Sequence, residues 1–234
     1  MCGRFTHLFT WRQLHDLYDI HRIAAERDVD RDIERAELPP SYNVAPTQAA
    51  PIIRLGDDGV REGTMARWGL IPPWADDAKA GIRAFNARSE TIATSPMFRS
   101  AFRSRRCVVP VSSFYEWQAI DGAKAKQPWN IFRADGQPLL LAGLWERWTK
   151  GGAPVDSFTI ATCAPNAFMA RLHDRMPCVL EGEHLASWLD PATTTASLQA
   201  MLAPAADGVL DAHRVSSRVG SVRNNDASLV GRVD

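Results

Sequence analysis

The stretch Cys107-Val-Val-Pro-Val-Ser-Ser-Phe-Tyr-Glu-Trp117 is apolar and rich in β-branched and aromatic residues. Such residues favour extended backbone, so we expect a strand here despite Pro110, which cannot donate a hydrogen bond within a sheet. On both sides of it, short apolar runs bounded by turn residues predict further strands. They cover residues 50–55, 65–71, 128–133, 138–145 and 157–163.

Helices are expected as short segments around these strands. Thr10 and Gln13 form a capping box in front of an apolar stripe, which predicts a helix over residues 10–20. Ser95-Pro96 is a typical helix start, and that helix is expected to run to about Arg105. Further helices are expected over residues 165–172, 183–189 and 194–202.

The order of these elements favours one fold class. Strands follow one another in runs, and the strand–helix–strand alternation of a parallel sheet is missing. The sequence therefore predicts an α+β fold, in which a mainly antiparallel, barrel-like β core is flanked by short helices. Because the chain has 234 residues and no break in composition, we expect a single domain over residues 1–234.

The composition is that of an ordinary folded chain. Hydrophobic residues make up 45% and charged residues 23%, which excludes a wholly disordered protein. No apolar run approaches the roughly 20 residues of a membrane-spanning helix. The first residues, Met1 to Phe5, lack the apolar segment of a secretion signal. We therefore expect a cytoplasmic protein.

Charge is balanced overall but unevenly distributed. The 27 basic and 27 acidic residues cancel, which excludes a uniformly basic surface. Residues 83–106 nevertheless contain a single acid, Glu90. A basic patch of this kind suits a nucleic acid backbone, although a solvated helix face has the same charge pattern. The basic residues of this stretch are Arg83, Arg88, Arg99, Arg103, Arg105 and Arg106.

The cysteines do not form a metal-binding or redox motif, because no two of them are spaced as C-x-x-C. Cys107, Cys163 and Cys178 lie among apolar residues, so we expect buried, unpaired thiols. Cys2 is expected to differ from them, because chain termini are usually exposed.

Removal of Met1 would make Cys2 chemically distinctive. Its α-amine and its thiol would then lie on adjacent carbons, with ordinary pKa values of about 8 and 8.5. The amine can form a Schiff base with an aldehyde, and the thiol can then close a five-membered thiazolidine ring. Alternatively, the residue can act as the N-terminal nucleophile of an amidohydrolase. An inert second residue remains a third alternative.

Glu116 stands among aromatic residues in Phe114-Tyr115-Glu116-Trp117. Burial in such surroundings disfavours the charged carboxylate and raises its pKa toward the value of a general acid. The alternative is an outward-facing glutamate on an alternating strand, for which no such shift is expected.

Two other segments concentrate polar groups. Asn86-Ala87-Arg88-Ser89-Glu90-Thr91 follows an apolar pair, and Leu172-His173-Asp174-Arg175-Met176-Pro177 places a histidine beside an acid and an arginine. A histidine in this setting is also typical of a helix C-terminus, where it interacts with the helix dipole. Taken singly, neither segment establishes a catalytic site.

Taken together, these segments carry a resemblance. Along the chain they occur in one order with a few others, and the set is similar to the SOS response-associated peptidase (SRAP) family. Its members include proteins that crosslink to abasic sites in single-stranded DNA. The resemblance runs from residue 2 to about Val222. The matching segments are residues 1–5, 42–46, 67–72, 86–91, 114–117, 142–145, 173–177 and 215–220.

The resemblance implies four catalytic residues. Cys2, freed of Met1, is implied to attack the abasic sugar and form the thiazolidine that joins protein to DNA. Asn86 would hold the α-amine, Glu116 would move a proton to and from the sugar oxygen, and His173 would relay protons at the Schiff base. Neither a metal nor a cofactor is implied.

The resemblance also implies a DNA-binding surface. Backbone and stacking contacts carry little sequence information, so we expect binding to single-stranded DNA, or to a single-strand/duplex junction, with little sequence preference. We expect a monomer that is associated with the nucleoid when bound to DNA. The DNA-contacting residues would be Arg4, Trp74, Arg88, Met97, Thr162 and Arg175.

Other activities remain open on sequence alone. A Schiff base acidifies the neighbouring C2′ hydrogens, so strand cleavage by β-elimination (abasic-site lyase action) is an expected side reaction. The peptidase name of the family implies hydrolysis, most simply removal of the chain's own Met1. The competing hypotheses are an N-terminal-nucleophile cysteine peptidase or amidase, and a non-covalent single-stranded DNA-binding module.

Overall fold

The computed structural model describes residues 2–24, 36–122 and 124–234, and its centre is a closed β-barrel. Neighbouring barrel strands pair in the order β11–β10–β7–β4–β5 and are antiparallel. A parallel pairing of β11 with β5 closes the ring. The barrel strands are β4 (Ala49–Leu55), β5 (Arg61–Trp68), β7 (Arg106–Val111), β10 (Leu139–Trp148) and β11 (Val155–Cys163).

Short strands extend the barrel at its edges. β2 pairs with β5, and β13 pairs with β10. At the other end of β11, β6 runs parallel and β12 antiparallel to it. Their bounds are β2 (Arg22–Ile23), β6 (Asn86–Arg88), β12 (Met176–Pro177) and β13 (Val179–Leu180).

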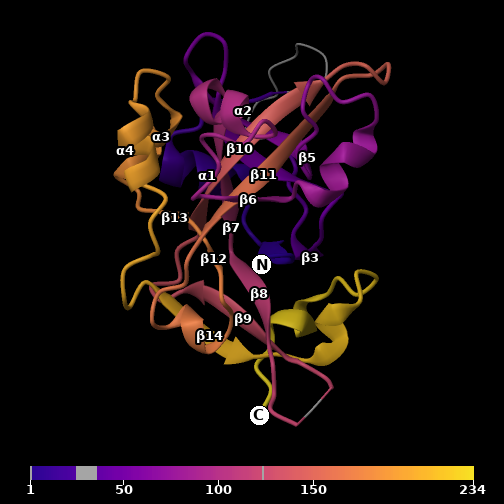
Figure 1. The fold of residues 1–234 in the computed structure, drawn as a ribbon. Coiled ribbons are helices and arrows are strands. Elements are labelled where there is room, and N and C mark those ends of the chain that lie inside the picture. The colour runs from indigo at the N-terminus through magenta and orange to yellow at the C-terminus, as the bar shows by residue number, and fades with distance from the viewer. Residues whose placement is uncertain (1, 25–35, 123) are drawn as a thin grey trace.

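A second, antiparallel sheet of five strands lies below the barrel in Figure 1, in the order β14–β9–β8–β1–β3. The chain passes from the barrel into this sheet where β7 gives way to β8. The N-terminus lies at the level where the two sheets meet (Figure 1). The strands are β1 (Phe5–His7), β3 (Ser41–Val44), β8 (Ser113–Gln118), β9 (Gln127–Arg133) and β14 (Leu210–Arg214).

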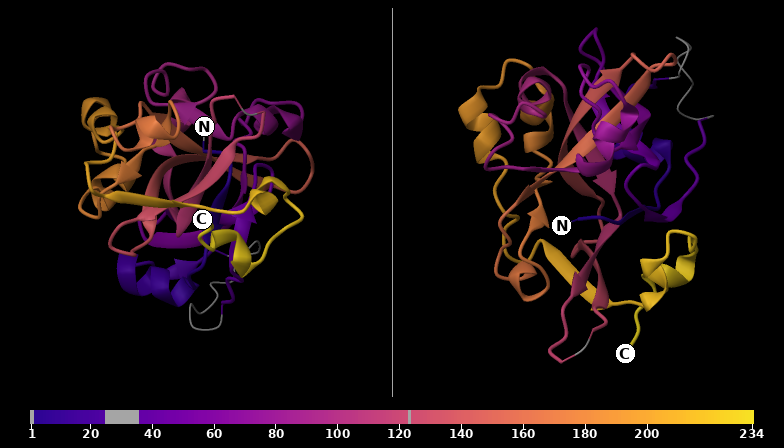
Figure 2. Two further views of the ribbon diagram at one scale, coloured as in Figure 1. Left: turned by 90° about the horizontal axis from the view of Figure 1, so that it is seen from below. Right: turned by 45° about the vertical axis from the view of Figure 1, so that its right-hand side comes forward.

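The helices are short and lie around the outside of the strands (Figure 2). The predicted fold class, α+β with a mainly antiparallel, barrel-like core and short flanking helices, is confirmed. No helix in the described part of the chain is long and apolar enough to cross a membrane. The helices are α1 (Trp11–Tyr18), α2 (Arg99–Ser104), α3 (His184–Leu189) and α4 (Thr195–Ala200); the 3₁₀ turns are η1 (Ala78–Arg83), η2 (Met169–Arg171), η3 (Ser217–Gly220) and η4 (Ala227–Val230).

Several element boundaries differ from the sequence predictions. The predicted strand at 107–117 is two strands separated at Ser112, whose backbone N–H bonds to Thr6 in the second sheet. Pro110 is accommodated inside β7, opposite Leu140. The capping box of Thr10 and Gln13 is present at α1.

Two predicted helices are shorter than expected. The helix expected from Ser95-Pro96 begins at Arg99, because turns occupy the residues before it and the N–H of Phe98 closes one onto the carbonyl of Ser95. The helix expected over 165–172 is reduced to the 3₁₀ turn η2, which starts after Asn166 caps the N–H of Met169. In both segments, residues that were predicted to be α-helical therefore form turns instead.

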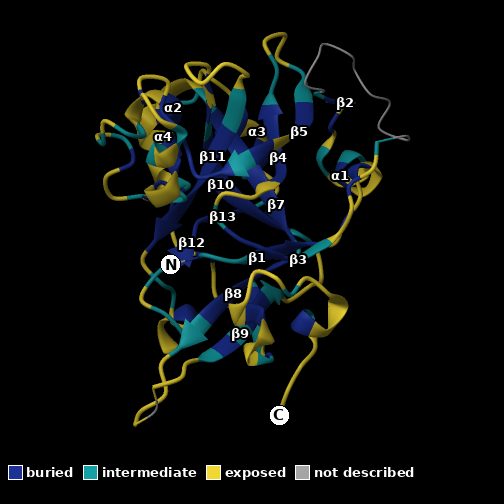
Figure 3. Cartoon of the chain, turned by 90° about the vertical axis from the view of Figure 1, so that its right-hand side faces the viewer, coloured by how far each residue is buried: buried dark blue, intermediate teal, exposed yellow. Residues whose placement is uncertain are grey.

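The indole of Trp68 is the centre of the aromatic core. It is fully buried and lies 4.8 Å from the ring of Phe5, 5.9 Å from Phe85 and 6.3 Å from Phe158. Its Nε1 donates a 2.8 Å hydrogen bond to the carbonyl of Phe85. Since Phe5 belongs to β1 and Phe85 precedes β6, one side chain positions both segments against the barrel. Figure 3 shows that the barrel strands are mostly buried, whereas the helices expose much of their surface.

Gly69 and Gly81 let η1 approach the end of β5. Gly69 has a φ of +122°, which side-chain-bearing residues rarely adopt. A Cβ on either glycine would overlap the carbonyl oxygen of the other. This close approach fixes the course of the chain from η1 to Phe85 and β6.

The opposite end of the barrel is closed by buried ion pairs. Arg54 donates to Glu62 at 2.8 Å and to Asp156 at 2.9 Å, and its guanidinium lies 4.1 Å over the ring of Trp145. Glu62 also accepts from Arg22 of β2 at 3.0 Å. Each buried charge is paired, as burial requires.

We predict that Gly81→Ala lowers the free energy of unfolding by about 1–3 kcal/mol, because the added methyl group overlaps the backbone of Gly69. Chemical denaturation measures this. The matched control is Gly182→Ala, since a Cβ at Gly182 meets no atom within 4 Å. Equal stability of both variants would contradict the close approach.

Candidate active site

The four residues predicted as catalytic come from distant parts of the chain and lie around Cys2. Asn86 donates from Nδ2 to the Cys2 carbonyl at 2.8 Å. His173 Nε2 lies 3.7 Å from Glu116 Oε2. The backbone N–H of Tyr115 donates to the carbonyl of Arg4 at 2.9 Å, which holds the start of the chain against the strand that carries Glu116.

Strand pairing explains this convergence. β1 pairs with β8 through Phe5 opposite Phe114, which brings the start of the chain beside Glu116. β6 pairs with β11 through Asn86 opposite Ile160, beside the start of the chain. The loop that carries His173 leaves the end of β11 and returns as β12.

Gln118 ties the His173 loop to β8. Its Nε2 donates to the carbonyl of Arg171 at 2.8 Å, and its Oε1 accepts from Trp129 Nε1 at 3.0 Å. Gln118 follows Glu116 by two residues, and Arg171 precedes His173 by two. Sequence reasoning missed this residue, because a single glutamine at the end of a strand gives no recognisable signal.

Cys2 is fully buried, so the expectation of an exposed terminal residue is wrong. The residue belongs to the main hydrophobic core, because the segment that leads into β1 enters the core together with Phe5. Burial raises the pKa of its thiol, and the negative charge of Glu116 raises it further. The thiol is therefore protonated at neutral pH.

Glu116 is buried within β8, with 2% of its surface exposed. Burial raises the pKa of its carboxyl to about 7. The alternative of an outward-facing glutamate is wrong, and the predicted direction of the pKa shift is confirmed. Near neutral pH both protonation states are populated, which suits a group that must donate and then accept a proton.

His173 is partly buried, and its contacts select a tautomer. The backbone N–H of Arg175 donates to Nδ1 at 3.0 Å, which requires a lone pair there. Asp174 Oδ1 lies 2.8 Å from Nδ1 and would favour a proton instead, but its side chain is 86% exposed and screened by water. Burial also lowers the pKa of His173. We therefore assign a neutral ring with its proton on Nε2, facing Glu116.

Asn86 offers an acceptor beside Cys2. Its amide nitrogen already donates a hydrogen bond to the Cys2 carbonyl. Its Oδ1 is buried and has no hydrogen-bond partner within the described residues. A buried acceptor without a partner costs free energy, and such groups gather where a ligand completes them.

Arg175 and Thr162, both predicted to contact DNA, lie against each other. Arg175 Nη2 donates to the Thr162 carbonyl at 2.6 Å, and Arg175 forms a two-pronged ion pair with Glu90, with one contact at 2.9 Å. Ser89 also donates its N–H to the Thr162 carbonyl at 2.8 Å. The loops after β6 and β11 are joined here.

Arg4 is engaged by the protein rather than pointing freely into solvent. It donates to Asn43 Oδ1 at 2.9 Å, to the Val219 carbonyl at 2.8 Å and to the Gly220 carbonyl at 3.2 Å. Asn43, which sequence reasoning also missed, donates to three carbonyls of the same C-terminal segment: Val219, Ser221 and Asn224. Arg4 and Asn43 therefore dock the C-terminal segment beside the start of the chain.

The other predicted DNA contacts differ in exposure. Trp74 is 58% exposed, Arg88 is exposed at the end of β6, and Met97 is half-buried. The predicted basic patch is wrong at two positions. Arg105 is paired with Glu146, and Arg106 is buried, donating to carbonyls that include those of Trp188 and Asp190. Exposed arginines remain at positions 83, 88, 99 and 103.

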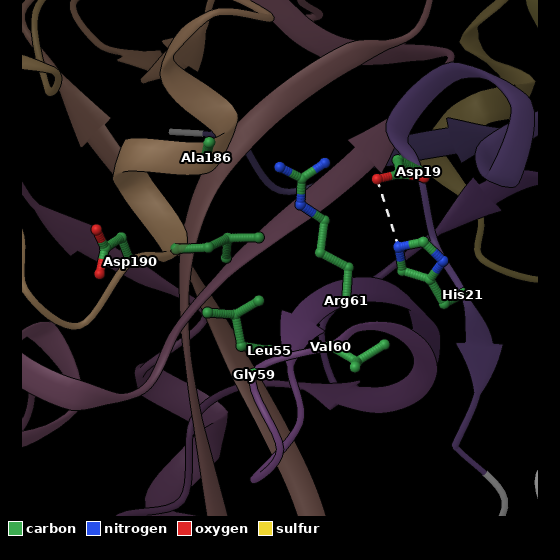
Figure 4. A pocket seen from close by; sticks show the side chains of 9 residues that line it. Asp19, His21, Leu55, Gly59, Val60, Arg61, Ala186 and Asp190 are labelled. Carbon is green, nitrogen blue, oxygen red and sulfur yellow. Dashed lines mark ion pairs between the residues drawn. The ribbon is translucent and has the colours of Figure 1, made fainter.

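Neither a metal site nor a surface hollow elsewhere in the described residues competes with this assignment. No group of three or more metal-ligating side chains occurs in the ranges that the structure describes. A hollow of about 340 Å³ lies between Arg61, His21 and Asp190 (Figure 4). It contains none of the predicted site residues. The thiols of Cys107, Cys163 and Cys178 are buried and form no disulfide bond, as predicted.

Comparisons with known proteins agree with the geometry. The family model described as "SOS response associated peptidase (SRAP)" matches residues 1–222. The abasic site processing protein YoaM of Bacillus subtilis is 43% identical, with 98% of this chain and 97% of YoaM aligned. The abasic site processing protein YedK of Escherichia coli is 33% identical over 98% of this chain and 99% of YedK. A crystal structure of a Bacteroides thetaiotaomicron protein superposes with a TM-score of 0.84 at 26% identity, covering 99% of this chain and all of the other.

We predict that Glu116→Gln changes how stability depends on pH. Because the folded state raises the pKa of Glu116 from 4.5 to about 7, it binds more protons than the unfolded state between these values. Wild-type stability relative to Glu116→Gln should therefore fall as pH rises through this window, by on the order of 2–4 kcal/mol. Denaturation at several pH values tests this. Parallel curves for the two proteins would show that the buried carboxyl is not perturbed.

Proposed function

This chain belongs to the SOS response associated peptidase family, and we propose that it processes abasic sites in DNA by covalent attachment through Cys2. The supporting observation is the position of Cys2 beside a buried carboxyl with a pKa of about 7 and an unpaired amide oxygen. An abasic site in its ring-opened form carries an aldehyde at C1′. An aminothiol is matched to that aldehyde, provided that Met1 is removed and the Cys2 amine is freed.

The amine acts first. The Cys2 thiol is protonated because burial raises its pKa, so the thiolate is scarce. Asn86 Oδ1 can accept a hydrogen bond from the amine without supplying a proton to it. Ring opening breaks the C1′–O4′ bond: protonated Glu116 supplies the proton to O4′, and the anomeric hydroxyl releases its proton to water as the C1′ aldehyde forms. The amine then adds to C1′, and loss of water leaves the imine.

The thiol completes the ring. The Cys2 S–H adds across the C1′=N bond, so that a C–S bond forms and the nitrogen gains a proton. Glu116, now a carboxylate, accepts the thiol proton and passes it to that nitrogen. His173 holds its Nε2–H toward Glu116, 3.7 Å from Oε2, and stabilises the carboxylate between the two transfers. The product is a thiazolidine that shields the lesion.

The imine intermediate also explains a side reaction. It acidifies the C2′ hydrogens, and loss of one of them cleaves the strand by β-elimination. Closure of the thiazolidine consumes the imine and competes with this lyase reaction. A rapid second step therefore favours the crosslink over strand cleavage.

The DNA in this proposal is single-stranded, or single-stranded on one side of a junction. Arg88 and Arg175 contact backbone phosphates, Thr162 lies beside Arg175, and exposed Trp74 stacks on an unpaired base with Met97 nearby. Arg4 acts mainly by holding the C-terminal segment beside Cys2, with a flanking phosphate as its DNA partner. We propose that the protein acts as a monomer, without a metal or cofactor.

Removal of Met1 belongs to the same proposal. Cys2, Glu116 and His173 are the groups that hydrolysis would need, and the scissile bond is the one preceding Cys2. Retention of Met1 in active protein, measured by intact mass, argues against the aminothiol chemistry. Turnover of peptides in the absence of DNA favours a peptidase or amidase instead.

We predict that Cys2 is required for a stable crosslink. Wild-type protein mixed with a labelled single-stranded oligonucleotide containing one abasic site should give a shifted band on a denaturing gel. Cys2→Ala and Cys2→Ser should give no shifted band that survives heat, because neither can close the thiazolidine. When both variants are prepared without Met1, as checked by intact mass, they keep the amine of residue 2, so borohydride reduction should trap an adduct in both.

An oligonucleotide without the lesion is the control for this experiment. A heat-stable band from Cys2→Ala would reject attachment through the thiol. Binding without any covalent product, from wild-type protein whose mass shows a free Cys2, would favour the non-covalent binding module.

We predict a pH-dependent crosslinking rate that depends on Glu116. The rate should change its slope near pH 7, where the carboxyl titrates. Glu116→Gln should slow crosslinking by about 10²–10⁴-fold, as expected for loss of a general acid–base group, and should remove that inflection. Single-turnover gels over a pH series measure both. An unchanged inflection in Glu116→Gln would assign it to another group.

A further inference from the structure

Glu90 is a carboxylate placed within the cationic part of the proposed DNA-binding surface. Both of its oxygens accept hydrogen bonds from Arg175, which is the two-pronged geometry that a guanidinium also forms with phosphate. Arg88 lies two residues earlier and pairs with Thr162, whose carbonyl accepts from Arg175. One acid is therefore close to both arginines to which we assign phosphate contacts.

Glu90 and Arg175 differ in how far their side chains are exposed and in how many other groups of the protein they contact. The Glu90 side chain is 52% exposed and that of Arg175 is 15% exposed. Arg175 Nη2 also donates to the Thr162 carbonyl at 2.6 Å, and its Nε is buried without a hydrogen-bond partner among the described residues. Glu90 can therefore swing into water at small cost, whereas Arg175 stays in place.

We propose that Glu90 is a built-in competitor for DNA phosphate, which occupies Arg175 in the free protein and is displaced when the backbone binds. This inference rests on the proposed function, because it takes Arg175 as a phosphate contact. Glu90 acts through Arg175 and Arg88, so it tunes binding and takes no part in the bond-making steps.

The consequence is selectivity for the lesion. A carboxylate on the site reduces the affinity for any DNA backbone, damaged or intact. Attachment at an abasic site is covalent, so it tolerates this reduced affinity, whereas intact DNA dissociates. Glu90 therefore limits the time spent on intact single strands. The hydrogen bonds from Arg175 lower the pKa of Glu90 to about 2, so the competitor stays charged at all physiological pH values.

The test compares Glu90→Gln with wild type for binding to a fluorescent single-stranded oligonucleotide that has no abasic site. Glutamine keeps the size and a hydrogen-bond acceptor but lacks the charge. Fluorescence anisotropy over a series of salt concentrations should show about five- to tenfold tighter binding at low salt. The logarithmic salt slope should steepen by about 0.7, the value for one more positive charge that is not already neutralised by a carboxylate when the single strand binds.

The matched control is Asp16→Asn. Asp16 is an exposed carboxylate paired with Arg12 at 3.1 Å, so the variant makes the same change in net charge and also removes the carboxylate of a surface ion pair. It lies on α1, across the molecule from the N-terminus (Figure 3). Its affinity and salt slope should match those of wild type. In an Arg175→Gln background, the gain from Glu90→Gln should fall by more than half.

The outcomes are separable. Tighter binding by Glu90→Gln alone, with a steeper salt slope, supports the competitor role. Equal or weaker binding overturns it, and weaker binding with slower crosslinking shows that the ion pair is a clasp between two loops. If wild type forms the Cys2-dependent crosslink in either of these cases, the proposed function survives and the role of Glu90 alone is rejected. If wild type forms no crosslink, the proposed function fails.

Discussion

The packing of Trp68 is the interaction on which the rest of the site depends. Its indole is fully buried and contacts aromatic rings from β1, from the segment before β6 and from β11. Cys2 lies just before β1, Asn86 directly follows Phe85, and Thr162 lies on β11. The indole N–H is satisfied by the Phe85 carbonyl, so its burial carries no unpaired donor and also fixes the backbone one residue before Asn86. The packing around Trp68 therefore fixes the positions of the segments that carry the site residues.

Sequence reasoning recovered the barrel because its strands are encoded locally. Short apolar runs bounded by turn residues predict the strands β4, β9 and β11 whatever their partners are. Sequence reasoning failed where contacts between distant parts of the chain determine where a strand ends or whether a residue is buried. Ser112 divides one apolar run into two strands because its N–H bonds to Thr6 from a distant part of the chain. Cys2 is buried because β1 is inserted between β3 and β8, and no local signal near the terminus reveals that insertion.

The candidate site was predictable as a set of residues but not as a set of contacts. Glu116 was recognisable because aromatic residues flank it, and its burial follows from them. Gln118 and Asn43 were not, because their roles come from carbonyls contributed by other loops. For the same reason the sequence placed Arg105 and Arg106 in a basic patch, although one pairs with Glu146 and the other serves as an internal donor. Counting charges along a chain does not distinguish an exposed arginine from one whose guanidinium is bonded to other groups of the protein.

The site combines features that each destabilise a folded protein: a buried carboxyl, a buried thiol and an unpaired amide oxygen. In the proposed mechanism their proximity gives the chemistry its order. Burial raises the pKa of the thiol, so little thiolate is present to attack the aldehyde before the amine forms the imine. The imine would then bring C1′ next to the thiol, and the carboxylate left by the first proton transfer would be the base for the second. More thiolate at this position would add sulfur to the aldehyde first and form a reversible hemithioacetal. In this mechanism the environment that costs stability therefore directs the reaction toward the ring-closed product.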